Sequence, residues 1–402
     1  MKKVLIINTT LNKGGAARVA YSLFEKLSVD FDMHFAYGRG TESSALKTFY
    51  FGNRLEMFIH IFLVRFLGLE GLGSYFSTKK LINYIKRENF ALVNLHNLHG
   101  YYVNFPQLLN FFKTIKVPII YSLHDEWPIT WLPAHSLGCT HCKTGVGHCT
   151  NTYSYPKNYF PVFSKYMLKK KRATFSNDLN MTIVCPSLWL KNNITDSYLN
   201  KFKIEVIANG IDTDVFVSVT EKNNLREKYN LPTDKKIVLF SASNLKDKTK
   251  GISFILETAK LLEDKNYLFL GLGNGQLENL PNVRTTGYIY NKNKLAEIYA
   301  LSDIFCFASS AETFLLSAAE ALACEIPVVG FDLPVVRELV NLEVGILTET
   351  NSIALATNFD ELLNNKERLI QMGQNGRELI VQNYSEKLFL EKYSIQYNNS
   401  LR

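Results

Sequence analysis

Short apolar runs alternate with longer helical patterns along most of the chain. Several runs are apolar on both faces, as strands of a parallel sheet covered by helices are. In the first half the strand-like runs are VLII (4–7), LVNL (92–95), VPIIYSL (117–123), MTIVC (181–185) and KIEVIA (203–208). In the second half they are KIVLFSA (236–242), YLFLGL (267–272), DIFCFA (303–308), PVVGF (327–331) and VGIL (344–347). This alternation predicts an α/β fold with right-handed crossovers.

Two domains are expected, because 402 residues exceed one ordinary core. The strand pattern pauses after IANGID and resumes with KIVLFSA. We therefore predict a doubly wound domain over residues 1–208, a linker over 209–220 and a second doubly wound domain over 221–383. The last helical pattern, 384–402, is expected to cross back onto the first domain. Ligands of such sheets bind outside the carboxyl ends of the strands, here in a cleft formed by the two domains.

The composition narrows the class of ligand. Apolar residues make up 47% of the chain and charged residues 20%, as in globular proteins. The net charge of +8 is scattered, apart from KKKR at 169–172. This distribution favours phosphate-bearing small ligands or an anionic membrane surface, and the absence of the usual motifs predicts no nucleic-acid partner.

Two segments bear on the membrane. The stretch MFIHIFLVRFLGL (57–69) is interrupted by His60 and Arg65 and is shorter than a spanning helix. It fits either a core or interface helix or an amphipathic surface lying on a bilayer. MKKVLIINTT has only a four-residue apolar run before Asn8, too short for a signal-peptide core. We expect a cytoplasmic protein, either free or peripheral to the cytoplasmic face of the membrane.

Glycines and lysines follow two of the predicted strands. Gly14 and Gly15 precede a helical pattern, where main-chain amides and the helix dipole can approach an anion, although a turn with positive φ also requires glycine. Lys246, Lys248 and Lys250 stand before another helical pattern, where they suit a diphosphate or form a solvated charge run. GLGNGQLENL (271–280) lacks the context of a dinucleotide fingerprint, and we interpret it as a turn after a strand.

Glu312 and Glu320 are eight positions apart in a small, apolar segment, AETFLLSAAEALAC. On one helix they would lie about 12 Å apart along the axis and about 80° apart around it. They would then contact different parts of an elongated ligand rather than form an acid pair. The alternatives are a capping box with Ser309 for Glu312 and a buried, hydrogen-bonded carboxylate for Glu320.

Three of the six cysteines are clustered with histidines in AHSLGCTHCKTGVGHC. A CxxC pair with a further cysteine and a histidine is typical of a structural zinc site. The candidate ligands are Cys139, Cys142, Cys149 and His148. Free thiols or a redox pair are the alternatives.

The segment ETFLLSAAEALACEIPVV resembles the E-x7-E segment of retaining glycosyltransferases of family 4, which have the two-domain GT-B fold. KGG near the start, HDEWPIT (124–130), CPSLWLKN (185–192), VIANGIDTDVF (206–216) and KGISFILETAKLL follow in the order of that family. LVNLHNLHGYYVNF (92–105) resembles the branch that assembles capsule, O-antigen and colanic-acid-type polysaccharides. The resemblance spans nearly the whole chain.

The resemblance implies a role for each matching residue. Glu312 would contact the donor sugar near the reacting carbon, and His124 would also lie at the sugar. Glu320 would bind the ribose hydroxyls of the nucleotide. The other residues implied in nucleotide-sugar binding, chiefly at the phosphates, are Lys250, Gly14, Gly15, Phe314, Leu315, Lys246 and Lys248. The acceptor-side candidates near His124 are Asp125, Trp127, His96 and His99. A histidine that ends an apolar run, followed by aspartate and tryptophan, is also typical of a site at a strand end.

The sequence departs from the family pattern at three positions. Asn244 stands near the place of the usual arginine, so that Lys246 or Lys248 is expected to substitute. Leu315 and Glu325 stand where glycine is common.

The resemblance implies retaining transfer of a sugar from a UDP- or GDP-sugar to a lipid-linked saccharide in cell-surface polysaccharide synthesis. No cofactor and no metal ion are expected to be required, because lysine and helix N-termini can offset the diphosphate charge. Two alternatives stay open: a nucleotide-sugar epimerase on the same fold, and a non-catalytic nucleotide-sugar-binding scaffold protein.

Overall fold

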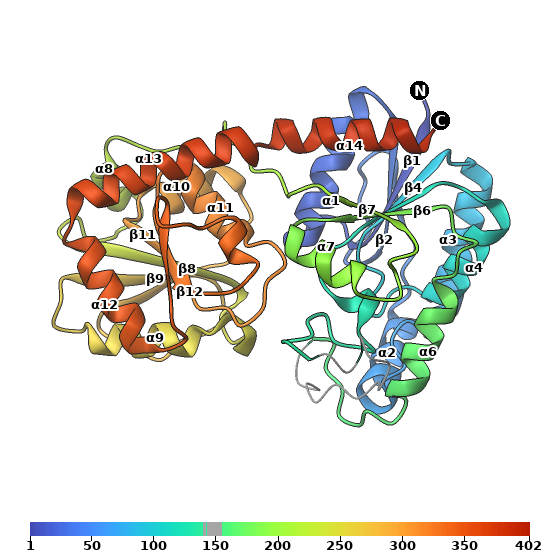
Figure 1. Cartoon of the computed structure of the whole chain (residues 1–402), viewed down its shortest axis with the longest axis horizontal. Helices are drawn as coiled ribbons and strands as arrows, with labels where there is room; N and C mark the ends of the chain where they lie inside the picture. Colours follow the sequence, from blue (N-terminus) through green and yellow to red (C-terminus); the bar gives the residue numbers. More distant parts are fainter. Residues whose placement is uncertain (140–141, 143–154) are drawn as a thin grey trace. The chain divides into compact units, whose positions relative to one another are not determined.

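The computed structural model describes residues 1–139, 142 and 155–402. The chain divides into two compact units (Figure 1). Unit 1 comprises residues 1–208 with 390–402, and unit 2 comprises residues 209–389. Each unit is a parallel sheet with helices packed against it.

The sheet of unit 1 has the order β3-β2-β1-β4-β5-β6-β7, and neighbouring strands are parallel. Its strands are β1 (Lys3–Thr10), β2 (Asp32–Arg39), β3 (Thr48–Tyr50), β4 (Leu92–Leu95), β5 (Ile119–Ser122), β6 (Met181–Cys185) and β7 (Lys203–Val206). Its helices are α1 (Gly15–Lys26), α2 (Arg54–Phe62), α3 (Tyr75–Glu88), α4 (Phe105–Ile115), α6 (Ser164–Thr174) and α7 (Leu188–Thr195). Strand residues such as Leu5, Val93 and Ile183 are fully buried in the core beneath these helices.

The sheet of unit 2 has the order β10-β9-β8-β11-β12-β13 and is also parallel. Its strands are β8 (Lys236–Asn244), β9 (Tyr267–Asn274), β10 (Val283–Gly287), β11 (Ile304–Phe307), β12 (Val328–Phe331) and β13 (Gly345–Thr348). Its helices are α8 (Lys222–Lys228), α9 (Ile252–Leu261), α10 (Lys292–Ala300), α11 (Leu316–Ala323), α12 (Ser352–Leu363) and α13 (Lys366–Asn383). The short helical turns are η1 (Leu27–Val29), η2 (Leu63–Leu67) and η3 (Trp127–Ile129) in unit 1, and η4 (Lys248–Lys250) and η5 (Val336–Glu338) in unit 2.

Each of the ten predicted apolar runs coincides with a strand, but β2, β3 and β10 were not predicted. β2 carries Asp32, His34 and Arg39 among its apolar residues, and β10 is the polar sequence VRTTG. β3 and β10 are edge strands, which need fewer apolar positions because one of their sides has no neighbouring strand. The apolar pattern therefore predicts the interior of each sheet better than its edges.

Both sheets reverse their strand order at one place. In unit 1 the reversal lies between the neighbours β1 and β4, and in unit 2 between β8 and β11. In doubly wound sheets, ligands bind outside the carboxyl ends of the strands at this reversal. The loops that follow β1, β4, β8 and β11 are therefore the places to look for function.

Helix α14 (Glu386–Ser400) runs from unit 2 into unit 1. Its first residue donates its amide to the carbonyl of Ile211 in unit 2. Further along, Tyr397 OH accepts a hydrogen bond of 2.8 Å from Asn94 Nδ2, and Tyr393 OH shares one of 2.8 Å with Ser122 Oγ. These buried tyrosines join the end of the chain to β4 and β5.

Over the described part of the chain, the helices are all too short or too polar to cross a membrane.

Glu325 has φ of +60°, a left-handed conformation that disfavours residues with a Cβ. It stands where the family commonly has glycine. We predict that Glu325→Gly raises the free energy of unfolding by about 0.5–1 kcal/mol, measured by urea denaturation, because glycine adopts this φ without strain.

The matched control is Glu325→Ala. It also removes the hydrogen bond of 2.9 Å that Glu325 Oε1 accepts from Ser218 Oγ, but it keeps a Cβ. If alanine stabilises the protein as much as glycine does, backbone strain is not the cause.

Candidate active site

Glu312 and Glu320 do not lie on one helix, so the geometry that was expected for them on a shared helix was wrong. Helix α11 begins at Leu316, and Glu312 lies in the loop between β11 and α11. The capping-box alternative was also wrong, since the residue that precedes the helix is Leu315 and not Ser309. The physical reason lies in the loop: Ser310 donates its amide to the carbonyl of Thr249 at 2.8 Å, which holds this segment against the loop after β8 instead of in a helical turn.

Glu312 forms an ion pair with Lys250, with Oε1 and Nζ 2.6 Å apart. The Glu312 side chain is 10% exposed and that of Lys250 is 31% exposed. Burial alone would lower the pKa of Lys250, but the charge of Glu312 and its hydrogen bond more than offset this and raise the pKa. Lys250 therefore keeps its positive charge at neutral pH.

Gly251 makes this pairing possible. It has φ of +61°, and a Cβ placed there would lie only 1.9 Å from the carbonyl oxygen of Ala308. Because glycine has no Cβ, the loop after β8 can rest against the end of β11. Lys250 and Glu312 thus meet at the reversal of the strand order, at the carboxyl ends of two neighbouring strands.

Glu320 is 5% exposed and lies on α11, where its Oε2 accepts a hydrogen bond of 2.9 Å from Tyr299 OH on α10. This agrees with the alternative of a buried, hydrogen-bonded carboxylate. Glu312 and Glu320 thus have different partners, Lys250 and Tyr299.

The remaining candidates of unit 2 lie in the same two loops. Lys246 and Lys248 are on the exposed part of the loop after β8. Phe314 packs its ring 5.8 Å from that of Tyr384, and Leu315 is buried directly before α11. The structure thus brings Lys250 to Glu312, and it leaves the other two lysines at the surface.

In unit 1, helix α1 follows β1 after a loop over residues 11–14 and begins at the predicted glycine pair. Gly14 has φ of +96° and precedes the first helical residue, Gly15. A Cβ at Gly14 would meet nothing within 4 Å. Glycine is therefore needed at this position for its conformation and not for space, and the helix N-terminus that follows has the polarity that attracts anions.

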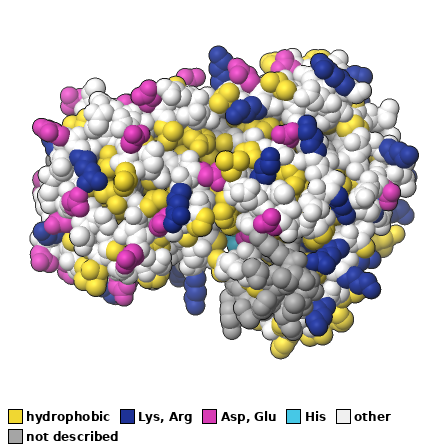
Figure 2. All heavy atoms as spheres, in the orientation of Figure 1, with side chains coloured by type: hydrophobic (Ala, Val, Ile, Leu, Met, Phe, Trp, Pro, Cys, Tyr) yellow, Lys and Arg dark blue, Asp and Glu magenta, His cyan; other side chains and the backbone are white. Residues whose placement is uncertain are grey.

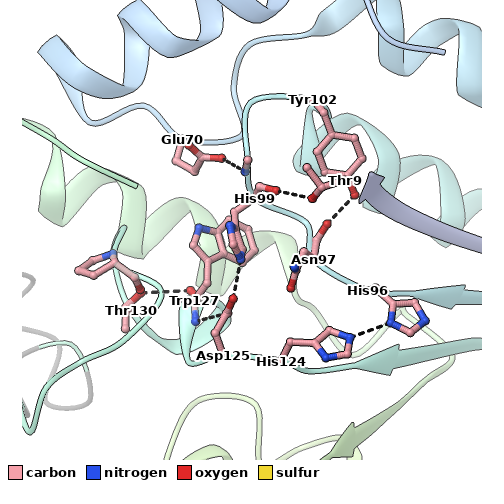
Figure 3. Close-up of polar contacts among 12 residues, drawn as sticks. Thr9, Glu70, His96, Asn97, His99, Tyr102, His124, Asp125, Trp127 and Thr130 are labelled. Atoms are coloured by element: carbon pink, nitrogen blue, oxygen red, sulfur yellow. Dashed lines mark hydrogen bonds and ion pairs between the residues drawn. The ribbon is translucent and has the colours of Figure 1, made fainter. Parts of the chain in front are cut away.

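His96 and His124 form a stacked pair at the ends of β4 and β5 (Figure 3). The centres of their rings lie 5.1 Å apart, and His96 Nδ1 shares a hydrogen bond of 2.8 Å with His124 Nε2. Burial lowers the pKa of His124 to about 4 and holds the pKa of His96 well below its usual value. Both rings are neutral near pH 7, and one donates the hydrogen bond that the other accepts.

His99 and Asp125 form a second pair beside the first (Figure 3). His99 Nε2 lies 2.6 Å from Asp125 Oδ2, and Asp125 Oδ1 accepts a hydrogen bond of 2.9 Å from the amide of Trp127. Burial would raise the pKa of Asp125, but the charge and hydrogen bond of His99 outweigh it and lower the pKa. The carbonyl of His99 accepts a hydrogen bond of 3.0 Å from Thr9 Oγ1, which ties the loop after β4 to the end of β1. The acceptor-side candidates thus gather at the reversal of the sheet of unit 1.

Two buried residues of charged type were not predicted: Lys171 supports the loop after β5, and Glu70 supports the loop after β4. Lys171 is fully buried, and its Nζ donates to the carbonyls of Trp127 at 2.6 Å and Thr130 at 3.0 Å while lying 3.6 Å from the centre of the Trp127 ring. Glu70 is also fully buried, and its Oε1 accepts a hydrogen bond of 2.9 Å from the amide of Gly100. Burial lowers the pKa of Lys171 to about 7. A signal was present for Lys171, because position 171 continues the buried helical stripe of Ser164, Met167 and Leu168.

The predicted zinc cluster is only partly described. Cys149 and His148 lie outside the described residues. Cys142 is buried, its Sγ accepts a hydrogen bond of 3.3 Å from the amide of Trp131, and burial raises the pKa of its thiol. Cys139 is partly buried and is a free thiol. Within residues 1–139, 142 and 155–402, no three histidine, cysteine or acidic side chains are grouped to hold a metal ion, and the zinc site stays a prediction.

The fold is that of GT-B glycosyltransferases. Over 99% of both chains, the structure is similar to sucrose-phosphate synthase from Thermosynechococcus elongatus, with a TM-score of 0.73 at 15% sequence identity. It is also similar to Anabaena HepE solved with UDP-glucose, with a TM-score of 0.70 at 15% identity over 99% of this chain and 100% of HepE. At this identity the likeness establishes the fold alone, and it confirms the predicted GT-B architecture.

The sequence supplies the family. The model of Glycosyltransferase Family 4 matches residues 13–215, and that of Glycosyl transferases group 1 matches residues 221–379. The chain belongs to glycosyltransferase family 4 and is a glycosyltransferase, as predicted.

Curated proteins with similar sequences are also named as glycosyltransferases. The colanic acid biosynthesis glycosyl transferase WcaC of Escherichia coli K12 is 25% identical over 85% of this chain and 86% of its own. The capsular polysaccharide biosynthesis glycosyltransferase CapM of Staphylococcus aureus is 27% identical over 60% and 67%.

The lowered pKa of His124 predicts acid sensitivity. Between pH 6.5 and 4 the unfolded chain binds a proton at this residue that the folded protein does not, so the free energy of unfolding falls as the pH falls through this window. We predict that His124→Gln removes about 2–3 kcal/mol of this loss, measured by urea denaturation across the pH range. Parallel pH profiles of the variant and the wild type would show that His124 titrates normally.

Proposed function

We propose that this glycosyltransferase moves a sugar from a nucleoside diphosphate, as a UDP- or GDP-sugar, to a lipid-linked saccharide during synthesis of a cell-surface polysaccharide. Relatives named for colanic acid, capsule and O-antigen biosynthesis support the product class. HepE, which has the same fold and was solved with UDP-glucose, supports the donor class. We place the reaction in the cytoplasm, at the cytoplasmic face of the membrane, where such donors and acceptors meet.

The observation that carries the proposal is the Lys250–Glu312 ion pair at the reversal of the sheet of unit 2. A cation at the start of a helix is suited to a diphosphate, because its charge and the helix dipole act in the same sense. Lys250 would hold the diphosphate, and Glu312 would face the sugar attached to it. Lys246 and Lys248, on the exposed part of the same loop, would approach the phosphates from the solvent side.

Glu320 would accept hydrogen bonds from the ribose hydroxyls. Its bond from Tyr299 fixes the orientation of the carboxylate. The main chain around Phe314 and Leu315, directly before α11, would approach the phosphates together with the amides of Gly14 and Gly15. The charged groups of the protein offset the diphosphate charge, so the proposal requires no cofactor.

In unit 1, the neutral His124 would bind the sugar, and His96 would fix its ring through their shared hydrogen bond. His99, Asp125 and Trp127 would orient the acceptor. In the retaining reaction the bond between the sugar carbon and the diphosphate oxygen breaks, and the acceptor hydroxyl attacks from the same face. The proton of that hydroxyl moves to the departing phosphate oxygen, which becomes basic as the bond breaks.

We predict different defects for the two glutamates. Glu320→Ala should weaken nucleotide binding, measured by calorimetry, and Glu312→Ala should chiefly lower kcat. Each change should be about fivefold or more, because the loss of a charged contact costs over about 1 kcal/mol. The matched control is Glu278→Ala, which removes an exposed carboxylate of the same unit that is paired with Lys260 at 2.9 Å.

Thermal unfolding of each variant separates a folding defect from a binding defect. The assignment is wrong if both glutamate variants keep binding and turnover within about twofold of the control, since a contact worth over about 1 kcal/mol would show. Release of free nucleotide from the donor only when acceptor is added separates a transferase from an epimerase and from a binding protein without catalysis.

A further inference from the structure

Helix α2 and the turn η2 expose an apolar face where a surface helix normally has polar residues. Residues spaced three or four apart are exposed along one side: Leu55 (70%), Phe58 (64%), Ile59 (51%), Phe62 (56%) and Phe66 (42%). The opposite side packs against a buried cluster that includes Val64 and Trp131. Apolar side chains on both the packed and the opposite side of a helix are normally found where both sides are buried, in a core or in a membrane.

A second segment continues this face. Between the described residue Tyr155 and the start of α6, exposed aromatic residues include Tyr159 (47%), Phe160 (54%) and Phe163 (39%). The amide of Tyr159 donates to the carbonyl of Arg65 at 2.8 Å, and the rings of Phe66 and Tyr159 lie 5.7 Å apart. The exposed apolar residues of 55–66 and 159–166 thus form one surface, here called the apolar face, at the end of unit 1 where α2 and α6 lie (Figure 1).

Basic side chains border the apolar face, and acidic ones are nearly absent. Residues 155–177 contain no aspartate or glutamate. In 54–69 the one acidic residue is Glu56, whose carboxylate accepts hydrogen bonds of 2.7 Å from the amides of Phe76 and Ser77. Among the described residues at this end of the unit, the exposed basic ones include Arg54, Arg65, Lys157, Lys165 and Lys169. Figure 2 shows Lys and Arg side chains beside hydrophobic ones at this end of the molecule.

We propose that the apolar face docks onto an anionic membrane surface. Phenylalanine, leucine and isoleucine side chains of α2 enter the boundary between headgroups and acyl chains, and tyrosines lie at headgroup level. Lysines and arginines at the border reach the lipid phosphates, each contributing through the negative surface potential. Charge favours a membrane over a second copy of this chain as the occupant. If two copies met through this face, their basic borders would lie against each other and repel.

The apolar face leads toward the candidate acceptor residues. Tyr155, at the start of the second segment, packs its ring 5.7 Å from that of His99 and 6.0 Å from that of Tyr101. A saccharide carried on a lipid in the same membrane would therefore emerge near the loop after β4. This last step rests on the proposed function, whereas docking to the membrane does not.

Sedimentation of the full chain with vesicles tests the docking. We predict binding to phosphatidylcholine vesicles that contain about 30 mol % phosphatidylglycerol and much weaker binding to pure phosphatidylcholine. Phe58→Glu/Phe62→Glu should reduce binding to the anionic vesicles about tenfold or more, because two charges replace the inserting rings. The matched control is Leu342→Glu/Ile353→Glu, which makes the same change at residues of unit 2 that are 77% and 70% exposed, and it should bind as wild type does.

A second variant, Lys165→Glu/Lys169→Glu, should bind anionic vesicles with several-fold lower affinity. Added salt should also weaken the binding of the wild type. The proposal is overturned if the wild type ignores anionic vesicles, or if the phenylalanine and control variants bind equally. It is also overturned if the wild type self-associates without lipid and Phe58→Glu/Phe62→Glu abolishes that association. Vesicle binding needs no donor, so the two proposals are tested independently. A failure to bind vesicles does not contradict sugar transfer, and a failure of sugar transfer does not contradict vesicle binding.

Discussion

The close contact between the loop after β8 and the end of β11 is the constraint on which the site of unit 2 depends. Any Cβ at Gly251 would overlap the carbonyl of Ala308, so this contact exists only because the residue is glycine. The carbonyl of Thr249 then accepts a hydrogen bond from the amide of Ser310, and Lys250 forms its ion pair with Glu312. Two opposite charges are fixed at the place where a doubly wound sheet binds its ligand, before any ligand arrives. Such preorganised charges act on a substrate without reorganising first.

The sequence predicted the fold well because the interior of a parallel sheet must be apolar on both faces. LVNL and MTIVC coincide with β4 and β6. The edge strand β10 is polar and contains no apolar run, and polar and charged residues interrupt the apolar run of β2, so neither strand was predicted. The order of the strands, and with it the reversal that gathers the candidate residues, comes from packing and was not readable from any one segment.

The candidate site was predicted in part. The resemblance selected Glu312, Lys250 and His124, but the spacing of the two glutamates suggested one helix, and a bond between Ser310 and Thr249 prevents that helix from starting early. Lys171 looked like one of four basic residues in a row, although the helix turns it inward beneath Trp127. Glu70 has no sequence signal, since its partner, the amide of Gly100, lies 30 positions away.

The tyrosines of α14 also constrain how the protein is made. Asn94 and Ser122 are buried in the middle of the first sheet, and their tyrosine partners lie 303 and 271 positions later in the chain. While the ribosome is still translating unit 2, Asn94 and Ser122 have only each other, joined by a hydrogen bond of 2.9 Å from Ser122 Oγ to Asn94 Oδ1, and the bonds to the two tyrosines are missing. Each missing bond leaves the first sheet less stable than in the finished protein. The unit that is synthesised first is thus completed only after residue 397 has emerged.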